Sequence, residues 1–344
     1  MLGIIYSLLA AATFALNAAA ARRAVLSGTV LQGLMVTVPL GVPLFLILVF
    51  LTGETGILRS MPLEAHLWFA AAGIVHFVIG RYGNYAASGA IGTNLASPIL
   101  QCDVLIALVL AMVLLGESLT PLRALGIILV LLGPSLVANH GDANKKKSSA
   151  DDTRTESANI ATAPPASAPK PTFQPRYAEG YAYAVIAAIG YGLSPVLIGL
   201  GLKAAGGTGA LAGGLVSYIA ATLAVGLILI VIRAPKSTYR IDGQALRWFA
   251  FAGCIVFLSQ AFRYAALVYA PASVVTALQR LSSLFRIYFG WIINPEHEVF
   301  DKSVIAATVV SMIGAIALSI STDLFLSLAN WPDWLVRLAK LQWP

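Results

Sequence analysis

Charged residues are scarce in this 344-residue chain. Asp, Glu, Lys and Arg together make up 11% of it, against about 25% in a typical soluble domain. Hydrophobic residues make up 58%. Too few polar groups remain to cover a water-exposed surface, which excludes an ordinary soluble domain. The net charge of +7 lies mainly between the apolar runs, so it bears on membrane orientation rather than on nucleic-acid binding.

Cysteine is nearly absent, and enzyme motifs are missing. Cys102 and Cys254 both fall inside apolar runs, where they are interpreted as small core residues rather than a disulfide or metal pair. The sequence has no HExxH motif and no P-loop. The stretch Gly207–Ala212 imitates a dinucleotide fingerprint, but no strand precedes it. We therefore expect no cofactor, no metal and no catalytic residue.

Long apolar runs fill the chain instead. Each has about 19 to 23 residues, enough for a helix to cross the roughly 30 Å hydrocarbon core of a bilayer. None shows the alternation of barrel strands. The sequence predicts an all-α integral membrane protein with ten transmembrane helices, at 3–22, 30–52, 67–87, 93–115, 121–139, 180–202, 210–232, 247–269, 273–293 and 302–321.

Two segments differ from these runs. Residues 140–179 contain Lys145–Lys147 and then an Ala/Pro-rich stretch with no apolar period, which predicts a disordered linker. Residues 323–344 form a basic, Trp-containing tail, which predicts an amphipathic segment at the membrane interface. The predicted domains are thus a first repeat at 1–139, the linker, a second repeat at 180–322 and the tail.

The two sets of five runs align at an offset of about 177 to 179 residues. Tyr85-Ala-Ala matches Tyr264-Ala-Ala, and Gly116-Glu117 matches Pro295-Glu296. Because each repeat has an odd number of spans, the second must enter the membrane from the opposite face. The sequence therefore predicts inverted repeats, an arrangement found in many carriers.

These motifs resemble those of a known family. The pattern Gly3…Phe14…Asn17 opening a span, and residues 108–133 with Gly116-Glu117 followed by Gly126 and Gly133, are similar to the drug/metabolite transporter superfamily of EamA type. The resemblance covers both halves, although Pro295-Glu296-His297-Glu298 departs from its pattern. It implies two inverted five-helix repeats that carry small metabolites.

Orientation is left open. Thirteen Lys and Arg residues, including Arg22, are assigned to loops on the linker's side, five, including Arg123, to the other side, and four to spans. The positive-inside rule then places the linker in the cytoplasm and both termini outside. The resemblance implies cytoplasmic termini instead, and the basic tail suits an anionic inner leaflet.

Charged side chains within the spans point to a site. A charge at the bilayer centre costs at least about 2.5–3.5 kcal/mol, yet Arg81, Arg263, Arg280 and Arg286 lie there with the single acid Asp103. If two or more of these arginines face the interior, the cavity is positive and favours carboxylate or phosphate. The alternatives are that Arg81 and Arg263 extend to the interface, and that Arg280 and Arg286 pair with Asp103 or backbone carbonyls.

Other polar residues complete the predicted site. Gln279, Ser282, Ser283 and Arg286 have the spacing of one helix face. Asn17 and Ser194 align in the first and sixth runs, where they either line the path or join helices. The predicted substrate-binding residues are Arg280, Arg286, Gln279, Gln101, Asn17, Ser194, Arg263, Tyr264 and Tyr85, and the predicted proton-coupling residues are Asp103 and His76.

The sequence thus predicts a secondary transporter working by alternating access on a small metabolite with an anionic group. Its expected partners are that metabolite and the lipid bilayer, and its expected location is the inner membrane of a bacterium. The alternatives are a flippase or exporter of a lipid-linked phosphate or amphipathic compound, and a non-transporting membrane sensor or enzyme. Substrate identity, direction, coupling ion and oligomeric state do not follow from the sequence.

Overall fold

The computed structural model describes residues 2–115, 120–133, 136, 174–269, 275, 278–320, 322–327, 329 and 331–341. Over these residues the chain is helical and forms no strand. This agrees with the composition, because a helix satisfies its backbone hydrogen bonds within the segment that lipid surrounds. The Gly116-Glu117 motif and most of the predicted linker lie outside the described residues.

The first half begins with two long helices. Helix α1 spans Leu2–Val25 and α2 spans Val30–Leu51, with Thr29 and Gln32 forming a capping box at the start of α2. The rest of this half is α3 (Thr55–Ser60), α4 (Leu63–Gly73), the π-helix η1 (Ile74–Gly80), α5 (Arg81–Leu100), α6 (Asp103–Leu115) and a helix over Pro121–Gly133.

The second half has a comparable order. Its elements are α8 (Tyr177–Ala204), α9 (Ala210–Val231), the 3-10 turn η2 (Lys236–Tyr239), α10 (Gly243–Tyr269), α12 (Ser282–Ile293), η3 (Pro295–His297) and α13 (Lys302–Ser319). Helix α8 begins three residues inside the predicted linker, so residues 177–179 are a correction to that boundary. The predicted tail contains two short helices, α14 (Thr322–Ser327) and α15 (Asp333–Ala339).

Six helical segments of the described chain are long and apolar enough to cross a membrane: Leu2–Val25, Val30–Leu51, Leu63–Ile106, Tyr177–Ala204, Ala210–Val231 and Gly243–Arg263. Shorter apolar helices cover Pro121–Gly133 and Lys302–Leu318. The long segment Leu63–Ile106 contains the predicted third span and the first part of the predicted fourth. Gly92 interrupts it with φ +83° and ψ 164°, a conformation that glycine adopts without a steric penalty.

The predicted fourth and ninth spans are not continuous helices. Turns at Gln101–Cys102 and at Arg280–Leu281 separate each from a helix that starts at Asp103 or Ser282. Gln101 and Arg280 are equivalent positions in the repeat alignment. Pro98 contributes to the first break, because it cannot donate a backbone hydrogen bond to the preceding turn. Polar residues therefore flank two interrupted helices near the middle of the bundle.

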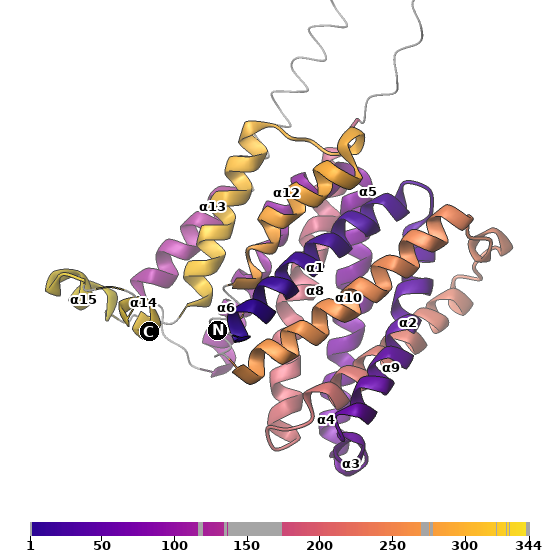
Figure 1. Cartoon of the computed structure of the whole chain (residues 1–344), viewed down its shortest axis with the longest axis horizontal. Coiled ribbons are helices and arrows are strands. Elements are labelled where there is room, and N and C mark those ends of the chain that lie inside the picture. Colours follow the sequence, from indigo (N-terminus) through magenta and orange to yellow (C-terminus); the bar gives the residue numbers. More distant parts are fainter. Residues whose placement is uncertain are drawn as a thin grey trace, which may run out of the picture.

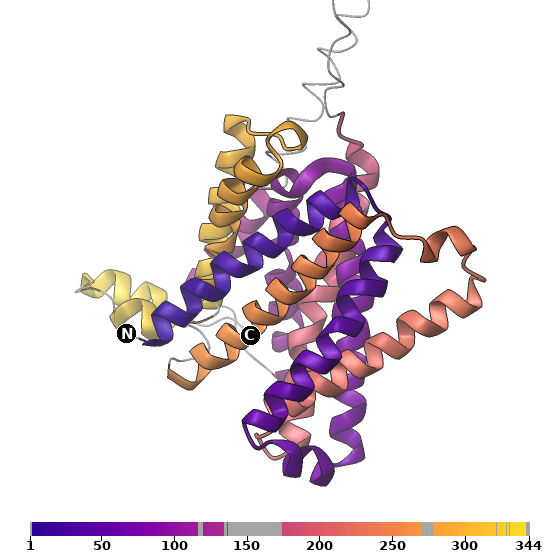
Figure 2. The same cartoon turned by 45° about the vertical axis from the view of Figure 1, so that its right-hand side comes forward.

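Helices from the two halves pack side by side. Helix α1 lies along α10 in both views (Figures 1 and 2), and its buried face is mostly alanine. Helix α13 approaches Pro121–Gly133 so closely that a Cβ on Gly314 would lie 2.6 Å from the backbone nitrogen of Val130. Small residues allow such approaches between membrane helices.

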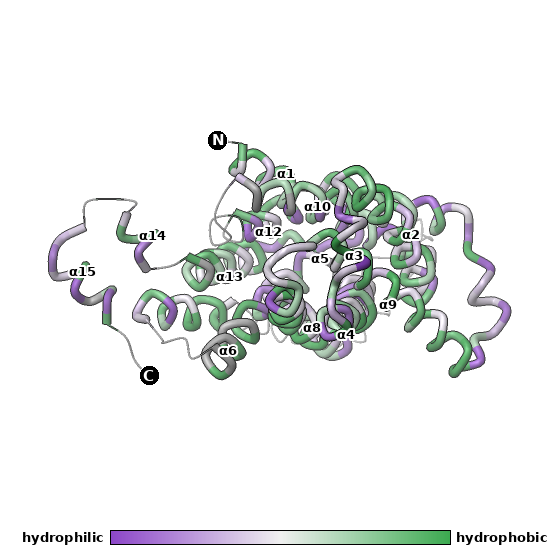
Figure 3. Tube along the Cα trace, turned by 90° about the horizontal axis from the view of Figure 1, so that it is seen from below, coloured by the Kyte–Doolittle hydropathy of each residue, from purple (hydrophilic) through white to green (hydrophobic). Residues whose placement is uncertain are grey.

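The outer surface is apolar. Phe50 and Leu51 of α2 and Ile230 and Val231 of α9 are all at least 70% exposed. Viewed along the bundle, the outer helices are largely hydrophobic, while hydrophilic residues occur in the interior, the loops and the tail (Figure 3). Since no water-soluble surface would expose such side chains over whole helices, this is the surface of a multi-pass membrane protein.

Candidate functional site

Two adjoining cavities lie inside the bundle. The first, of about 410 Å³, is called the basic cavity here and is lined by α1, η1, α5, α6, α8, α10 and α12, together with Arg123. The second, of about 560 Å³, is called the apolar cavity and is lined by α2, α4, η1, α8, α9 and α10. His76, Pro195 and Arg263 line both. Each volume lies within the roughly 300–1,000 Å³ of ligand pockets.

The basic cavity carries a large excess of positive charge. Among the described residues that line it are five arginines and one carboxylate, Asp103. Guanidinium groups stay protonated in essentially any protein environment. The arginines are Arg81, Arg123, Arg263, Arg280 and Arg286.

Arg280 and Asp103 form an ion pair in the lining of this cavity. The Arg280 Nη1 atom donates to both Asp103 oxygens, at 2.9 and 3.1 Å, and the two side chains are 19% and 18% exposed. Asp103 is the first residue of α6 and Arg280 lies two residues before α12, so the pair links the two interrupted helices. It balances one of the five arginines, and no second carboxylate occurs among the described lining residues.

Several polar atoms on this wall lack a hydrogen-bond partner. They are Asn17 Oδ1, Gln279 Nε2, Arg280 Nε and Arg286 Nε, and all four residues line the basic cavity. Buried polar atoms are usually satisfied, because an unmade hydrogen bond costs about 1–3 kcal/mol. A polar ligand in the cavity would give these atoms partners.

Arg81 does not extend to the membrane interface. It is 4% exposed, and its guanidinium lies 4.8 Å from the Phe77 ring centroid and 5.9 Å from that of Tyr218. Its hydrogen bonds to Thr37 and Tyr218 are long, at 3.3–3.4 Å. The interfacial alternative is therefore wrong for Arg81, whose charge is held by aromatic faces inside the bundle.

His76 lies where the two cavities meet. It belongs to the π-helix η1, and its ring centroid is 4.8 Å from those of Phe77 and Tyr191. A π-helical turn shifts the register of the side chains that follow it and often occurs at functional sites. Here it places His76 toward both cavities and Arg81 toward the basic one.

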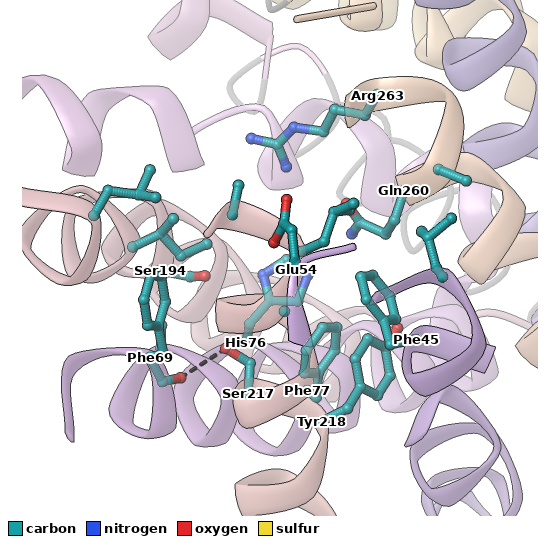
Figure 4. A pocket seen from close by; sticks show the side chains of 18 of the residues that line it. Phe45, Glu54, Phe69, His76, Phe77, Ser194, Ser217, Tyr218, Gln260 and Arg263 are labelled. Carbon is teal, nitrogen blue, oxygen red and sulfur yellow. Dashed lines mark hydrogen bonds between the residues drawn. The ribbon is translucent and has the colours of Figure 1, made fainter. Parts of the chain in front are cut away.

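The apolar cavity has mainly hydrophobic walls. Figure 4 shows Phe45, Phe69 and Phe77 beside it, with His76 between them and the guanidinium of Arg263 above. Ser217 donates its hydroxyl to the Phe69 carbonyl and so offers the cavity no free donor. Thr52 and Glu54, just beyond the end of α2, also line this cavity, which extends it toward the membrane face opposite the linker.

Most of the predicted site residues line these cavities. Asn17, His76, Tyr85, Asp103, Arg263, Gln279, Arg280 and Arg286 line the basic cavity, and Ser194 lines the apolar one. Gln101 lines neither: it is 4% exposed and donates to Ser283 Oγ at 2.7 Å. The side chain of Tyr264 lies outside the described part. Ser283 lines neither cavity, and the turn at Arg280–Leu281 interrupts the helical spacing assumed for Gln279 and Ser283.

Gln101 and Gln279 make a matched pair for mutation. Gln101→Ala should lower thermal stability by about 1–3 kcal/mol, because it leaves the buried Ser283 hydroxyl without its partner. Gln279→Ala should change stability less and weaken substrate affinity, because Gln279 lines the cavity. Thermal melting in detergent and uptake kinetics in proteoliposomes measure the two effects. A stability loss confined to Gln279→Ala would contradict these assignments.

Comparison with known proteins agrees with this architecture. Residues 1–139 match the model of the EamA-like transporter family. A solved structure described as "Crystal structure of protein" has a TM-score of 0.51 and 16% identity, covering 95% of this chain and 98% of that chain. That likeness concerns the fold alone. No curated protein matches this chain.

EamA-like family members are transporters, and the apolar helices place this chain in a membrane as a multi-pass protein. The EamA-like segment supplies Asn17, His76, Arg81 and Asp103 to the basic cavity. No cluster of three or more potential metal ligands occurs among the described residues.

A second polar network connects the end of α1 to α5 and to the loop that follows α12. Arg22 of α1 donates to the carbonyls of Ser88, Gly89 (3.0 Å) and His297 (2.9 Å). Its Nε lies 3.9 Å from Glu298 Oε1, and both side chains are fully buried. Arg22 was assigned to a loop when charges were compared between faces. It lies within α1 and is buried, so it does not count as a loop charge.

Glu298 caps the half-helix that follows Gly92. Its carboxylate accepts from the Thr93 nitrogen at 2.8 Å, the Thr93 hydroxyl at 2.7 Å and the Asn94 nitrogen at 2.9 Å. Burial raises the pKa of Glu298, whereas Arg22 and these donors act to lower it. A carboxylate is stabilised at a helix N-terminus. Glu298, from the second half of the chain, therefore stabilises the start of a helical segment in the first half.

The sequence did not single out Arg81 as a cavity residue, nor Arg123, Arg22 or Glu298. Arg123 was assigned to a loop, but it lines the basic cavity. Glu298 departs from the family pattern in the sequence, but its spacing along the chain does not indicate which residues it contacts. Its role as a cap follows from its contacts with Arg22 and with Thr93 and Asn94, which come directly after Gly92.

Proposed function

We propose that this protein is a secondary transporter that moves a small organic anion by alternating access. The observation that carries the proposal is the basic cavity, with five arginines, one carboxylate and four buried polar atoms without partners. Arginine binds carboxylate and phosphate through paired, charge-assisted hydrogen bonds. A cavity of this charge favours an anion over a neutral or cationic substrate.

The two halves, residues 1–139 and 180–322, would act as inverted repeats around this cavity. Three features support that role: equivalent helix breaks at Gln101 and Arg280, the Asp103–Arg280 pair between the halves, and the close packing of α13 on Pro121–Gly133. The network of Arg22 and Glu298 would hold the linker side shut. The apolar cavity reaches Glu54 on the other side, which corresponds to one access state.

Asp103 is proposed to couple transport to protons. In its charged form it holds Arg280; once protonated, it would release that guanidinium to the substrate. His76 is a second proton-carrying candidate, because it lies between the two cavities. Location in a bacterial inner membrane, with an interfacial tail, belongs to the same proposal.

Uptake by purified protein in proteoliposomes tests the proposal. Small radiolabelled carboxylates and phosphates should enter saturably, and amines or neutral analogues of equal size should not. Protein-free liposomes provide the background. Saturable uptake of cations without uptake of any anion would overturn the assignment. A bundle without a cavity would have favoured a sensor, and the described residues line two cavities.

A further inference from the structure

The two cavities differ in chemistry but share three wall residues. The basic cavity holds the arginines, and the apolar cavity is walled by Phe45, Phe69 and Phe77 with Leu202 and Leu211. Binding of a small inorganic anion would use the first cavity and leave the second without a role. Their common boundary at His76, Pro195 and Arg263 makes them two ends of one site.

We infer that the substrate is an amphipathic organic anion, with its charged group in the basic cavity and an apolar body in the apolar cavity. This inference rests on the proposed function and specifies its substrate class. Arg263 lines both cavities and its guanidinium projects over the apolar one (Figure 4). It is placed to contact the anionic group at the point where the apolar body begins.

The walls of the apolar cavity are mostly hydrophobic, and with Glu54, Gln260 and Arg263 also lining it they suit a mainly hydrophobic body. Its aromatic side chains come from helices of both halves: Phe45 and Phe69 from the first, Tyr218 from the second. The Phe45 and Tyr218 rings stack at 5.2 Å. Apolar area withdrawn from water contributes about 25 cal/mol per Å², so a chain or ring placed here adds affinity that the arginines alone cannot supply.

A homologous series of n-alkyl phosphates, from methyl to dodecyl, tests the inference. Binding is measured by equilibrium dialysis on the full chain in nanodiscs, with free probe concentrations determined directly and protein-free nanodiscs subtracted. Affinity should rise about three- to four-fold per methylene until the apolar cavity is filled, and then stay constant. An unbroken rise to dodecyl would place the chain in the bilayer and overturn the assignment.

Ala261→Phe fills the apolar cavity from α10, where Ala261 forms part of the wall. It should flatten the dependence on chain length while methyl phosphate binds as before. Ala306→Phe, on the exposed side of α13, is the matched control and should keep the wild-type slope. The slope of the wild-type protein stands as a test even if Ala261→Phe fails to fold.

The outcomes separate the two proposals. If methyl phosphate binds in a manner that depends on Arg286 but affinity does not increase with chain length, the amphipathic substrate is excluded and the anion transporter remains. If no alkyl phosphate binds through Arg286, the proposed function fails. A rising affinity that is lost in Ala261→Phe supports the amphipathic substrate class.

Discussion

Replacing Arg286 by glutamine should raise the KM for anion uptake at least about thirty-fold. Arg286 lines the basic cavity, and among the described residues its Nε has no hydrogen-bond partner. Losing one partner of a buried, charge-assisted contact costs about 2–5 kcal/mol. Uptake in proteoliposomes at several substrate concentrations measures the change, and Arg286→Lys should recover part of it by restoring the charge without the planar fork.

Arg59→Gln is the matched control, because Arg59 is exposed on α3. It removes the same charge from the same protein without entering the cavity. Wild-type kinetics are expected for it. An Arg286→Gln protein that folds, inserts and transports like Arg59→Gln would contradict the role assigned to the basic cavity.

The second large effect is expected at Glu298. Glu298→Ala should lower stability by about 3–5 kcal/mol, because it leaves Arg22 buried without its carboxylate and removes the cap of Thr93 and Asn94. Glu296→Ala, three residues into the same loop and exposed, should change stability far less. Thermal melting of both variants in one detergent measures the difference.

A double variant separates lost charge pairing from lost packing. Arg22→Leu combined with Glu298→Leu removes both buried charges, so it should be more stable than the sum of the single variants predicts. Strictly additive losses would show that Arg22 and Glu298 do not interact. If the network of Arg22 and Glu298 also keeps the linker-side entrance closed, the double variant should make the cavity residues more accessible to a labelling reagent added on that side.

The all-helical membrane fold followed from the sequence, because apolar length and composition determine membrane helices directly. Six of the described helical segments are long and apolar enough to span a membrane, and the ten spans and inverted repeats stay predictions. Eight of the predicted site residues line the basic cavity. This location was predictable because charged residues within apolar spans usually face the interior of the bundle. The interrupted helices were not predicted: Pro98 hinted at the first break, but nothing near Arg280 and Leu281 indicated the second. Gln101 and Ser283, which flank these breaks, line neither cavity and are hydrogen-bonded to each other instead.

Arg81 and Glu298 show where spacing stops being informative. Arg81 lies near a helix end in sequence, yet the π-helix before it rotates it inward onto Phe77 and Tyr218. Glu298 lies in a loop, and its donors at Thr93 and Asn94 are more than 200 positions away. Both depend on contacts between helices from the two halves, which a single sequence does not specify.

Anomalous diffraction from crystals of the full chain grown with a bromoalkyl phosphate tests the central claim most directly. The account predicts phosphate density against Arg280 and Arg286 in the basic cavity, with the bromine peak in the apolar cavity beyond His76. Phosphate density confined to exposed arginines, with both cavities free of probe at saturating concentration, would contradict it.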